Sequence, residues 1–133
     1  MDRMKHEELT SAILSCCFDV INELGSGFLE SVYEKALIVA LSQKGLQVDS
    51  QVPLKVSFRG VIVGDFYADV IVEGKVLIEL KAVSRVLQEH KAQVINYLNA
   101  TGIDVGQLVN FGNPKLEYYR FYRSNPVYPV HPV

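Results

Sequence analysis

The hydrophobic pattern of the chain changes from a helical to an alternating period near Gly45, and it returns to a helical period only once. Before that point, apolar residues recur at three- and four-residue steps and glycines follow, so helices are predicted over Glu8–Leu24 and about Leu29–Lys44. Strands are predicted where β-branched residues alternate with polar ones, and one more helix where the helical period returns. The predicted segments after Gly45 are Val52–Phe58, Val61–Val72, Val76–Lys81, Val86–Ala100, Val105–Phe111 and Leu116–Tyr122. The order ααβββαββ, without an internal repeat, predicts an α/β fold: a mixed α+β sheet flanked by helices.

The length of 133 residues is slightly below that of one typical domain, and 49% of the residues are hydrophobic. Such a chain buries roughly two thirds of its unfolded surface, which is enough for one core. We therefore expect a single domain over residues 1–123. The last ten residues, 124–133, include three prolines and are predicted to form an extended tail.

Several classes of protein are disfavoured by composition. Thirteen Lys and Arg against 15 Asp and Glu give a net charge of −2, so a nucleic-acid partner would have to be bound through a local patch. No apolar run approaches the roughly 20 residues of a membrane helix. The polar amino terminus lacks the apolar segment of a signal peptide, so we expect a cytoplasmic protein. Cys16 and Cys17 are adjacent and fit neither a disulfide framework nor a zinc site.

Three charged residues stand in predicted strands where such residues are uncommon. Asp69 interrupts an apolar β run, and Glu79 and Lys81 lie two apart in the next strand. Because side chains alternate between the faces of a strand, Glu79 and Lys81 must project to the same side. A buried charge costs several kcal/mol unless it is paired or binds a metal, so this pattern indicates a functional site.

The turn between these two strands decides whether Asp69 joins the other two residues. A two-residue turn at Glu73-Gly74 would place Asp69 on the opposite face from Glu79, whereas a three-residue loop, Glu73-Gly74-Lys75, places them together. The second register is predicted because it separates an apolar face from a charged one. Its apolar pairs are Val72 with Val76, Val70 with Ile78, and Ala68 with Leu80; its other face pairs Ile71 with Leu77, Asp69 with Glu79, and Tyr67 with Lys81.

Neighbouring carboxylates of this kind repel each other, and a divalent cation would remove the conflict. Asp69, Glu79 and the backbone carbonyl of Leu80 make an oxygen-only donor set suited to Mg²⁺ or Mn²⁺. Lys81 could then stabilise an attacking hydroxide or a phosphate. The pattern therefore favours hydrolysis of phosphodiester bonds.

The spacing Asp69…Glu79-Leu80-Lys81 resembles the D…(D/E)-x-K core of the PD-(D/E)xK nuclease superfamily, although no proline precedes Asp69. Gln93 to Tyr97 matches the Q-x-x-x-Y helix of helicase-associated exonucleases in that superfamily. The resemblance implies that Gln93 and Tyr97 position the substrate or Lys81. His90, one turn earlier, lies on the same helical face.

A second motif lies near the amino terminus. The segment Gly27-Phe28-Leu29-Glu30-Ser31-Val32-Tyr33 resembles the G-x-x-E-x-x-Y motif of the GxxExxY protein family, and the resemblance extends over nearly the whole chain. That family is placed among the PD-(D/E)xK folds. The resemblance implies that Glu30 is the acidic residue that the first part of the chain contributes to the metal site.

Structural explanations stand beside these functional ones. The charged strand residues could form an exposed hairpin face, and Glu30 could be a helix-start carboxylate favoured by the helix dipole. Gln93 and Tyr97 could form a polar helix face, and Tyr33 could be a core residue. The aromatic last strand could stack bases, or could be an amphipathic edge strand.

The sequence favours a Mg²⁺- or Mn²⁺-dependent nuclease acting on DNA or RNA, with Glu30, Asp69, Glu79 and Leu80 as metal ligands. The catalytic residues expected are Glu30, Asp69, Glu79, Lys81, Gln93 and Tyr97. The alternative is a catalytically weak or inactive nuclease fold that binds nucleic acid or protein. The apolar tail and the aromatic last strand are also consistent with a homodimer.

Overall fold

The structure, a computed structural model, describes residues 5–123, so the tail predicted for 124–133 lies outside the described residues. Three helices and five strands occur in the order predicted, ααβββαββ. Their bounds are α1 Glu7–Leu24, α2 Glu30–Gln43, β1 Val48–Phe58, β2 Val61–Val72, β3 Val76–Lys81, α3 Gln88–Thr101, β4 Val105–Asn110 and β5 Glu117–Tyr122. The fold is the predicted mixed α+β sheet flanked by helices.

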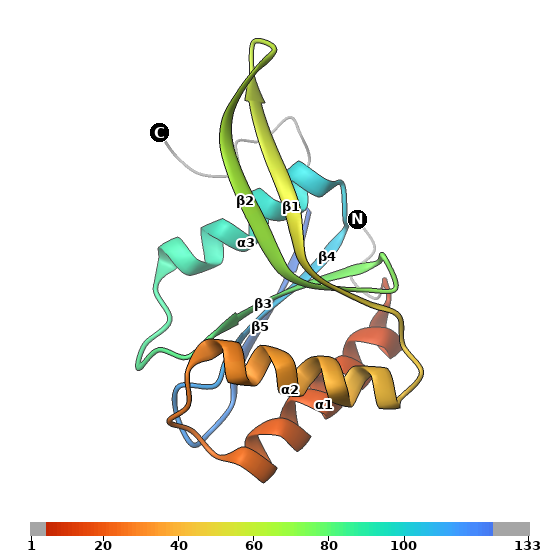
Figure 1. The fold of residues 1–133 in the computed structure, drawn as a ribbon, viewed down its shortest axis with the longest axis vertical. Helices are drawn as coiled ribbons and strands as arrows, with labels where there is room; N and C mark the ends of the chain where they lie inside the picture. Colours follow the sequence, from red (N-terminus) through yellow and green to blue (C-terminus); the bar gives the residue numbers. More distant parts are fainter. Residues whose placement is uncertain (1–4, 124–133) are drawn as a thin grey trace.

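The five strands form one sheet in the order β1-β2-β3-β4-β5. β3 and β4 are parallel, and α3 makes the crossover that a parallel pair requires. All other neighbours are antiparallel. α1 and α2 cover one face of the sheet and α3 the other (Figure 1). β3 and β4 are buried along almost their whole length, as central parallel strands usually are.

Two apolar clusters fill the two layers. The larger lies between the sheet and α1 and α2, and includes Ile13, Leu37 and Ile78. The smaller lies between the sheet and α3, and includes Leu77, Leu98 and Leu108. None of the helices described between residues 5 and 123 combines the length and hydropathy that a membrane span requires.

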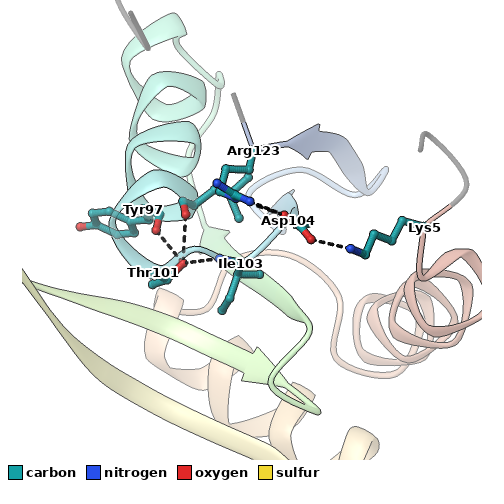
Figure 2. Close-up of polar contacts among 7 residues, drawn as sticks. Lys5, Tyr97, Thr101, Ile103, Asp104 and Arg123 are labelled. Atoms are coloured by element: carbon teal, nitrogen blue, oxygen red, sulfur yellow. Dashed lines mark hydrogen bonds and ion pairs between the residues drawn. The ribbon is translucent and has the colours of Figure 1, made fainter. Parts of the chain in front are cut away.

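The helix ends follow the glycine and capping signals. Gly25 and Gly102 end α1 and α3 with positive φ, and their N–H groups bond back into the helix. At the end of α3, Thr101 Oγ1 donates to carbonyl oxygens of the preceding turn and accepts the N–H of Ile103 (Figure 2). α3 begins two residues later than predicted, where the Leu87 N–H donates to His90 Nδ1 at 2.9 Å.

β1 begins at Val48, four residues before the predicted start at Val52. The alternating pattern does not extend to this start because Gln51 interrupts the strand with a φ of 49°. Ser50 pairs with Val70, and Val52 with Ala68, on either side of this break. Beyond it, residues 52–68 form a two-stranded ribbon, here called the arm, that extends past the rest of the sheet (Figure 1).

The chain ends of the described region are tied together at Asp104, which immediately precedes β4. Its carboxylate lies 2.6 Å from Lys5 Nζ before α1, and 2.9 Å from an Arg123 guanidinium nitrogen after β5 (Figure 2). The segment before α1 is therefore held by an ionic contact to the residue that precedes β4.

A second tie fixes the loop after β3. Asn110 accepts the Val83 N–H at 3.0 Å and donates to the Val83 carbonyl at 2.9 Å. Gly112 lies so close to this loop that a Cβ there would stand 2.0 Å from the Val83 carbonyl oxygen. The Phe111 N–H also donates to the Lys81 carbonyl at 2.8 Å. Residues 110–112 therefore hold the strand end that carries Lys81.

Candidate active site

The site forms where β2 and β3 separate. The predicted three-residue loop is confirmed, because the strands pair Val72 with Val76, Ile71 with Leu77, and Val70 with Ile78. The ladder then ends, so the predicted pairs Ala68–Leu80, Asp69–Glu79 and Tyr67–Lys81 are wrong as backbone pairs. Beyond Val70, β2 continues only with β1 and bends away, while β3 continues with β4.

Carboxylates replace the missing ladder bonds in the gap. Glu79 Oε2 accepts the backbone N–H of Asp69 at 2.8 Å, and Asp69 Oδ2 accepts the N–H of Leu80 at 2.9 Å. Buried backbone donors need partners, and these two side chains supply them. Each of the two carboxylates thus bonds to the strand that carries the other.

The bend also changes which face Ala68 occupies. Ala68 was expected beside Val70 and Leu80, but it packs with Leu54 and Leu77 in the cluster under α3. The simple alternation fails because β2 bends between Ala68 and Val70, opposite the left-handed backbone at Gln51. Tyr67 lies on the arm with 56% of its surface exposed.

Lys81 faces α3, on the same side of β3 as Glu79, as the two-residue spacing predicted. Lys81 Nζ lies 3.4 Å from Gln93 Oε1, and Gln93 Nε2 donates to the Tyr97 hydroxyl at 3.1 Å. Burial, and to a smaller extent the charge of Glu79, raises the pKa of Tyr97. The helix face predicted from Q-x-x-x-Y is therefore in contact with the predicted lysine.

Glu79 is the most buried of the charged residues, with 3% of its surface exposed. Burial first, and then the neighbouring charge of Asp69, raise the pKa of Glu79 to about 8. Burial also raises the pKa of Asp69, against the opposing effect of the Leu80 N–H. Two carboxylates with raised pKa values in one gap are typical of a functional site.

Glu30 approaches the same place from the first turn of α2. Burial raises the pKa of Glu30, and this is the largest effect on it. Lys81 and the Ala82 backbone N–H lower this pKa, and the charge of Asp69 raises it. The position of Glu30 at a helix start agrees with the dipole explanation as well as with a role in the site.

Two residues of the site were missed from the sequence. Gln51 Nε2 donates to Glu34 Oε1 at 2.9 Å, and it lies 3.4 Å from Asp69 Oδ1. The one available signal for Glu34 was its spacing of four residues from Glu30, which places both on one helical face. Nothing in the sequence marked Gln51, because its position depends on the backbone break in β1.

His90, Tyr33 and the last strand have structural roles in the fold. His90 accepts the Leu87 N–H at the start of α3, so it acts as a cap. Tyr33 is fully buried, stacks on Phe111 with ring centroids 4.8 Å apart, and donates to the Gly25 carbonyl at 2.6 Å. Residues 117–122 form an edge strand.

The donor chemistry of the gap is suited to a divalent cation. Asp69, Glu79 and Glu30 carry carboxylate oxygens, the donor type that Mg²⁺ and Mn²⁺ prefer, and the Leu80 carbonyl faces the gap because N–H and C=O of one strand residue point to the same side. Within residues 5–123, however, no three His, Cys, Asp or Glu side chains stand ready to hold a metal together. Asp69 Oδ2 and Glu79 Oε2 each accept a backbone N–H, so a cation would share these carboxylates with the amides or displace them.

Comparisons with known proteins agree with this fold. A family model described as the PD-(D/E)XK nuclease superfamily matches residues 7–121. The search of curated proteins found no match to this chain. The crystal structure of SSO0001 is similar with a TM-score of 0.57 and 19% sequence identity, over 91% of this chain and 61% of that one. This chain thus corresponds to about three fifths of that protein, and the likeness shows the fold alone.

Proposed function

Because this chain belongs to the PD-(D/E)XK nuclease superfamily, we propose that it is a metal-dependent nuclease that hydrolyses phosphodiester bonds of DNA or RNA. One observation carries the proposal: the half-buried Asp69 and the buried Glu79 share a gap between strands with Lys81. Two neighbouring carboxylates removed from water beside a lysine are costly to maintain unless the charges are used. We also infer membership of the GxxExxY family, which the motif from Gly27 to Tyr33 supports, and one domain over residues 1–123.

The residues of the chain have distinct roles in this proposal. Lys81 carries the positive charge that orients a water molecule or a phosphate oxygen. Gln93 accepts from the Lys81 ammonium and holds it in place, and the Tyr97 hydroxyl in turn accepts from Gln93. Water attacks phosphorus, one P–O bond breaks, and the products are a phosphate monoester and a hydroxyl group.

Nucleases of this superfamily generally use divalent metals, and we propose Mg²⁺ or Mn²⁺ for this chain. Glu30, Asp69, Glu79 and the Leu80 carbonyl would hold the ion. When bound, such a cation lowers the pKa of its water ligand and neutralises charge on the phosphate. Burial raises the pKa values of Asp69 and Glu79, and a bound cation would favour their ionised forms.

The alternative is a nuclease fold that binds nucleic acid or protein with little or no turnover. It is favoured by the arrangement of the described carboxylates, of which no three are grouped to hold a metal. The two proposals differ in whether Mn²⁺ binds through Asp69.

The test combines binding with cleavage. Calorimetry would measure Mn²⁺ binding to the wild type and to Asp69→Asn, and cleavage would be followed on single- and double-stranded DNA and RNA. Lys81→Ala is expected to lower the cleavage rate at least ~100-fold, the usual effect of removing one charge-stabilising group. Lys75→Ala, in the exposed turn before β3, is the matched control and should cleave like the wild type.

Two results would contradict the nuclease proposal. If Lys81→Ala cleaved at the wild-type rate, the assignment of the site would be wrong. If the wild type bound no Mn²⁺ and cleaved none of the four substrates, the interaction module would be the better explanation.

A further inference from the structure

A groove separates the arm from α3 and leads to the candidate active site. It is lined on the arm side by Leu54, Val56 and Phe66, and on the helix side by Gln93, Tyr97 and Asn99, among other residues. Its volume is about 810 Å³, within the ~300–1,000 Å³ range typical of ligand sites. This space is here called the arm groove.

The arm groove shares two residues with the site. The Gln93 side-chain carbonyl accepts from Lys81, and the Tyr97 hydroxyl accepts from the Gln93 amide. Gln93 and Tyr97 also line the groove. A molecule lying in the groove would therefore touch the residues that hold Lys81. The groove and the site are parts of one continuous surface.

The lining of the arm groove is aromatic and amide-rich. The rings of Phe66 on the arm and Tyr97 on α3 meet across the groove, 5.9 Å apart at 46°, and Gln93 and Asn99 contribute amide groups. Among the described residues that line it, none is Lys or Arg, and Glu89 adds a negative charge at the rim. Phosphate groups would find no cation there.

Gly64 gives the ring of Phe66 its position. A Cβ at Gly64 would lie 2.7 Å from Phe66 Cε2, so the missing side chain makes room for the ring. Phe66 keeps 43% of its surface exposed although it touches Tyr97. This exposed part of Phe66 is available for contact with a base.

We propose that the arm groove binds unpaired nucleobases of a single-stranded nucleic acid and thereby presents the adjoining phosphate to the candidate site. Bases stack on aromatic side chains, and their edges bond to amides. A duplex would hide its bases and present phosphates to a surface without cations. The inference rests on the proposed function, and it narrows the substrate class to unpaired strands.

The test is binding without divalent metal, so that it does not depend on cleavage. Fluorescence anisotropy with EDTA present would compare a labelled mixed-sequence single strand of DNA, the same length of abasic strand, and the matching duplex. The single strand with bases is expected to bind at least ~10-fold tighter than the other two, since stacking of one base is worth that much.

Phe66→Ala should lose about tenfold in affinity for the single strand, and Phe66→Tyr should retain the wild-type affinity. Phe58→Ala is the matched control, because Phe58 is equally aromatic and 59% exposed on the same hairpin, outside the groove. Thermal melting of each variant would confirm that it is folded. Equal losses in Phe66→Ala and Phe58→Ala would overturn the proposal.

Other outcomes also decide it. Duplex or abasic binding as tight as that of the single strand would overturn the proposal, as would no binding of any oligonucleotide. If the wild type bound no single strand but self-associated, and Phe66→Ala abolished that self-association, the groove would be a contact between copies of the chain and the proposal would be overturned.

If the single strand binds through Phe66 but is never cleaved, the groove proposal holds and the nuclease proposal fails. If the wild type cleaves but Phe66→Ala binds the single strand with unchanged affinity, the nuclease proposal holds and the groove proposal fails.

Discussion

Asp69 and Glu79 each bond to the strand that carries the other, with Glu79 accepting the Asp69 N–H and Asp69 accepting the Leu80 N–H. The two carboxylates therefore do two things at once. They satisfy backbone donors that the separation of β2 and β3 would leave unpaired, and they concentrate negative charge in one gap. The cost of that charge is the basis of the first prediction.

Glu79→Gln should stabilise the metal-free protein at high pH. The pKa of Glu79 is raised from 4.5 to about 8, so between these values the unfolded state binds fewer protons than the folded one. The stability of the wild type therefore falls as pH rises through this window. Glutamine does not titrate, yet it can still accept the Asp69 N–H. The difference in melting temperature in favour of Glu79→Gln should grow from pH 5 to pH 9 with chelator present. A difference that does not change with pH would contradict this.

Gln51→Gly should be more stable than Gln51→Ala. The φ of 49° at Gln51 is left-handed, and glycine adopts it without the ~1 kcal/mol or more that a Cβ costs. Chemical denaturation would measure the difference in free energy of unfolding. Both variants lack the amide that reaches Glu34 and Asp69, so cleavage should fall equally in both. Equal stability of the two would show that the backbone relaxes at this position.

Tyr33→Phe should lower the free energy of unfolding by about 1–2 kcal/mol. The buried hydroxyl donates to the Gly25 carbonyl at 2.6 Å and accepts the Phe28 N–H at 3.2 Å, so both bonds that shape the loop before α2 are lost. Tyr118→Phe is the matched control, since Tyr118 lies half exposed on the edge strand. A loss in Tyr118→Phe as large as that in Tyr33→Phe would argue against this role.

Gly112→Ala should destabilise the protein by at least ~1–3 kcal/mol, because its Cβ would overlap the Val83 backbone at 2.0 Å and backbone cannot swing aside. Gly64→Ala is the same substitution at a site where the nearest atom is the far end of the Phe66 ring, and it should cost less. Thermal denaturation of the two variants gives the comparison. Cleavage by Gly112→Ala should also fall, since Val83 follows Lys81 in the loop that Asn110 holds.

Asp104→Asn should lower stability at neutral pH but not in acid. Hydrogen bonds from Lys5 and Arg123 hold the pKa of Asp104 below its usual 3.8, so its contribution is present above that pH and is lost as pH falls through the folded value. The contacts are partly exposed, so the effect should stay below ~1 kcal/mol and shrink in high salt. The difference in melting temperature between the wild type and Asp104→Asn should be constant from pH 7 to about pH 4 and should shrink as pH falls below 3.8 toward the folded pKa. A difference that stays the same down to pH 2 would contradict the assignment.

Much of this fold could be predicted from local pattern. Helix ends at Gly25 and Gly102 follow from glycine in the left-handed conformation, and the register of β2 with β3 follows from keeping apolar residues on one face. Strand alternation predicted that Lys81 lies on the same face as Glu79, and the resemblance to the Q-x-x-x-Y helix implied that Gln93 positions the substrate or Lys81, which it contacts. These features depend on residues close together in the chain or on a simple period.

Other features of the fold arise where the regular alternation of side chains along a strand breaks down. The bend of β2 accounts for three such features. The strands β2 and β3 separate at Val70, Ala68 packs on the other face of the sheet, and the Gln51 side chain points toward Glu34 and Asp69. Hydrophobic pattern carries no signal for such a bend. Gln51 was missed for that reason, whereas Glu34 was missed although its spacing from Glu30 places both on one helical face. His90 shares the helical face of Gln93 and Tyr97, but it caps α3.

Residues 110–112 contact the end of β3 and the loop after it, so this strand end is fixed only after β4 has been synthesised. Glu30, Asp69, Glu79 and Lys81 all leave the ribosome before β4, yet β3 gains its parallel neighbour only after α3 has been made. Until Phe111 reaches the Lys81 carbonyl, a nascent chain carries every charged group of the candidate site without the strand that aligns the lysine. The candidate site is therefore completed only after β4 has been made, later than all of its charged residues.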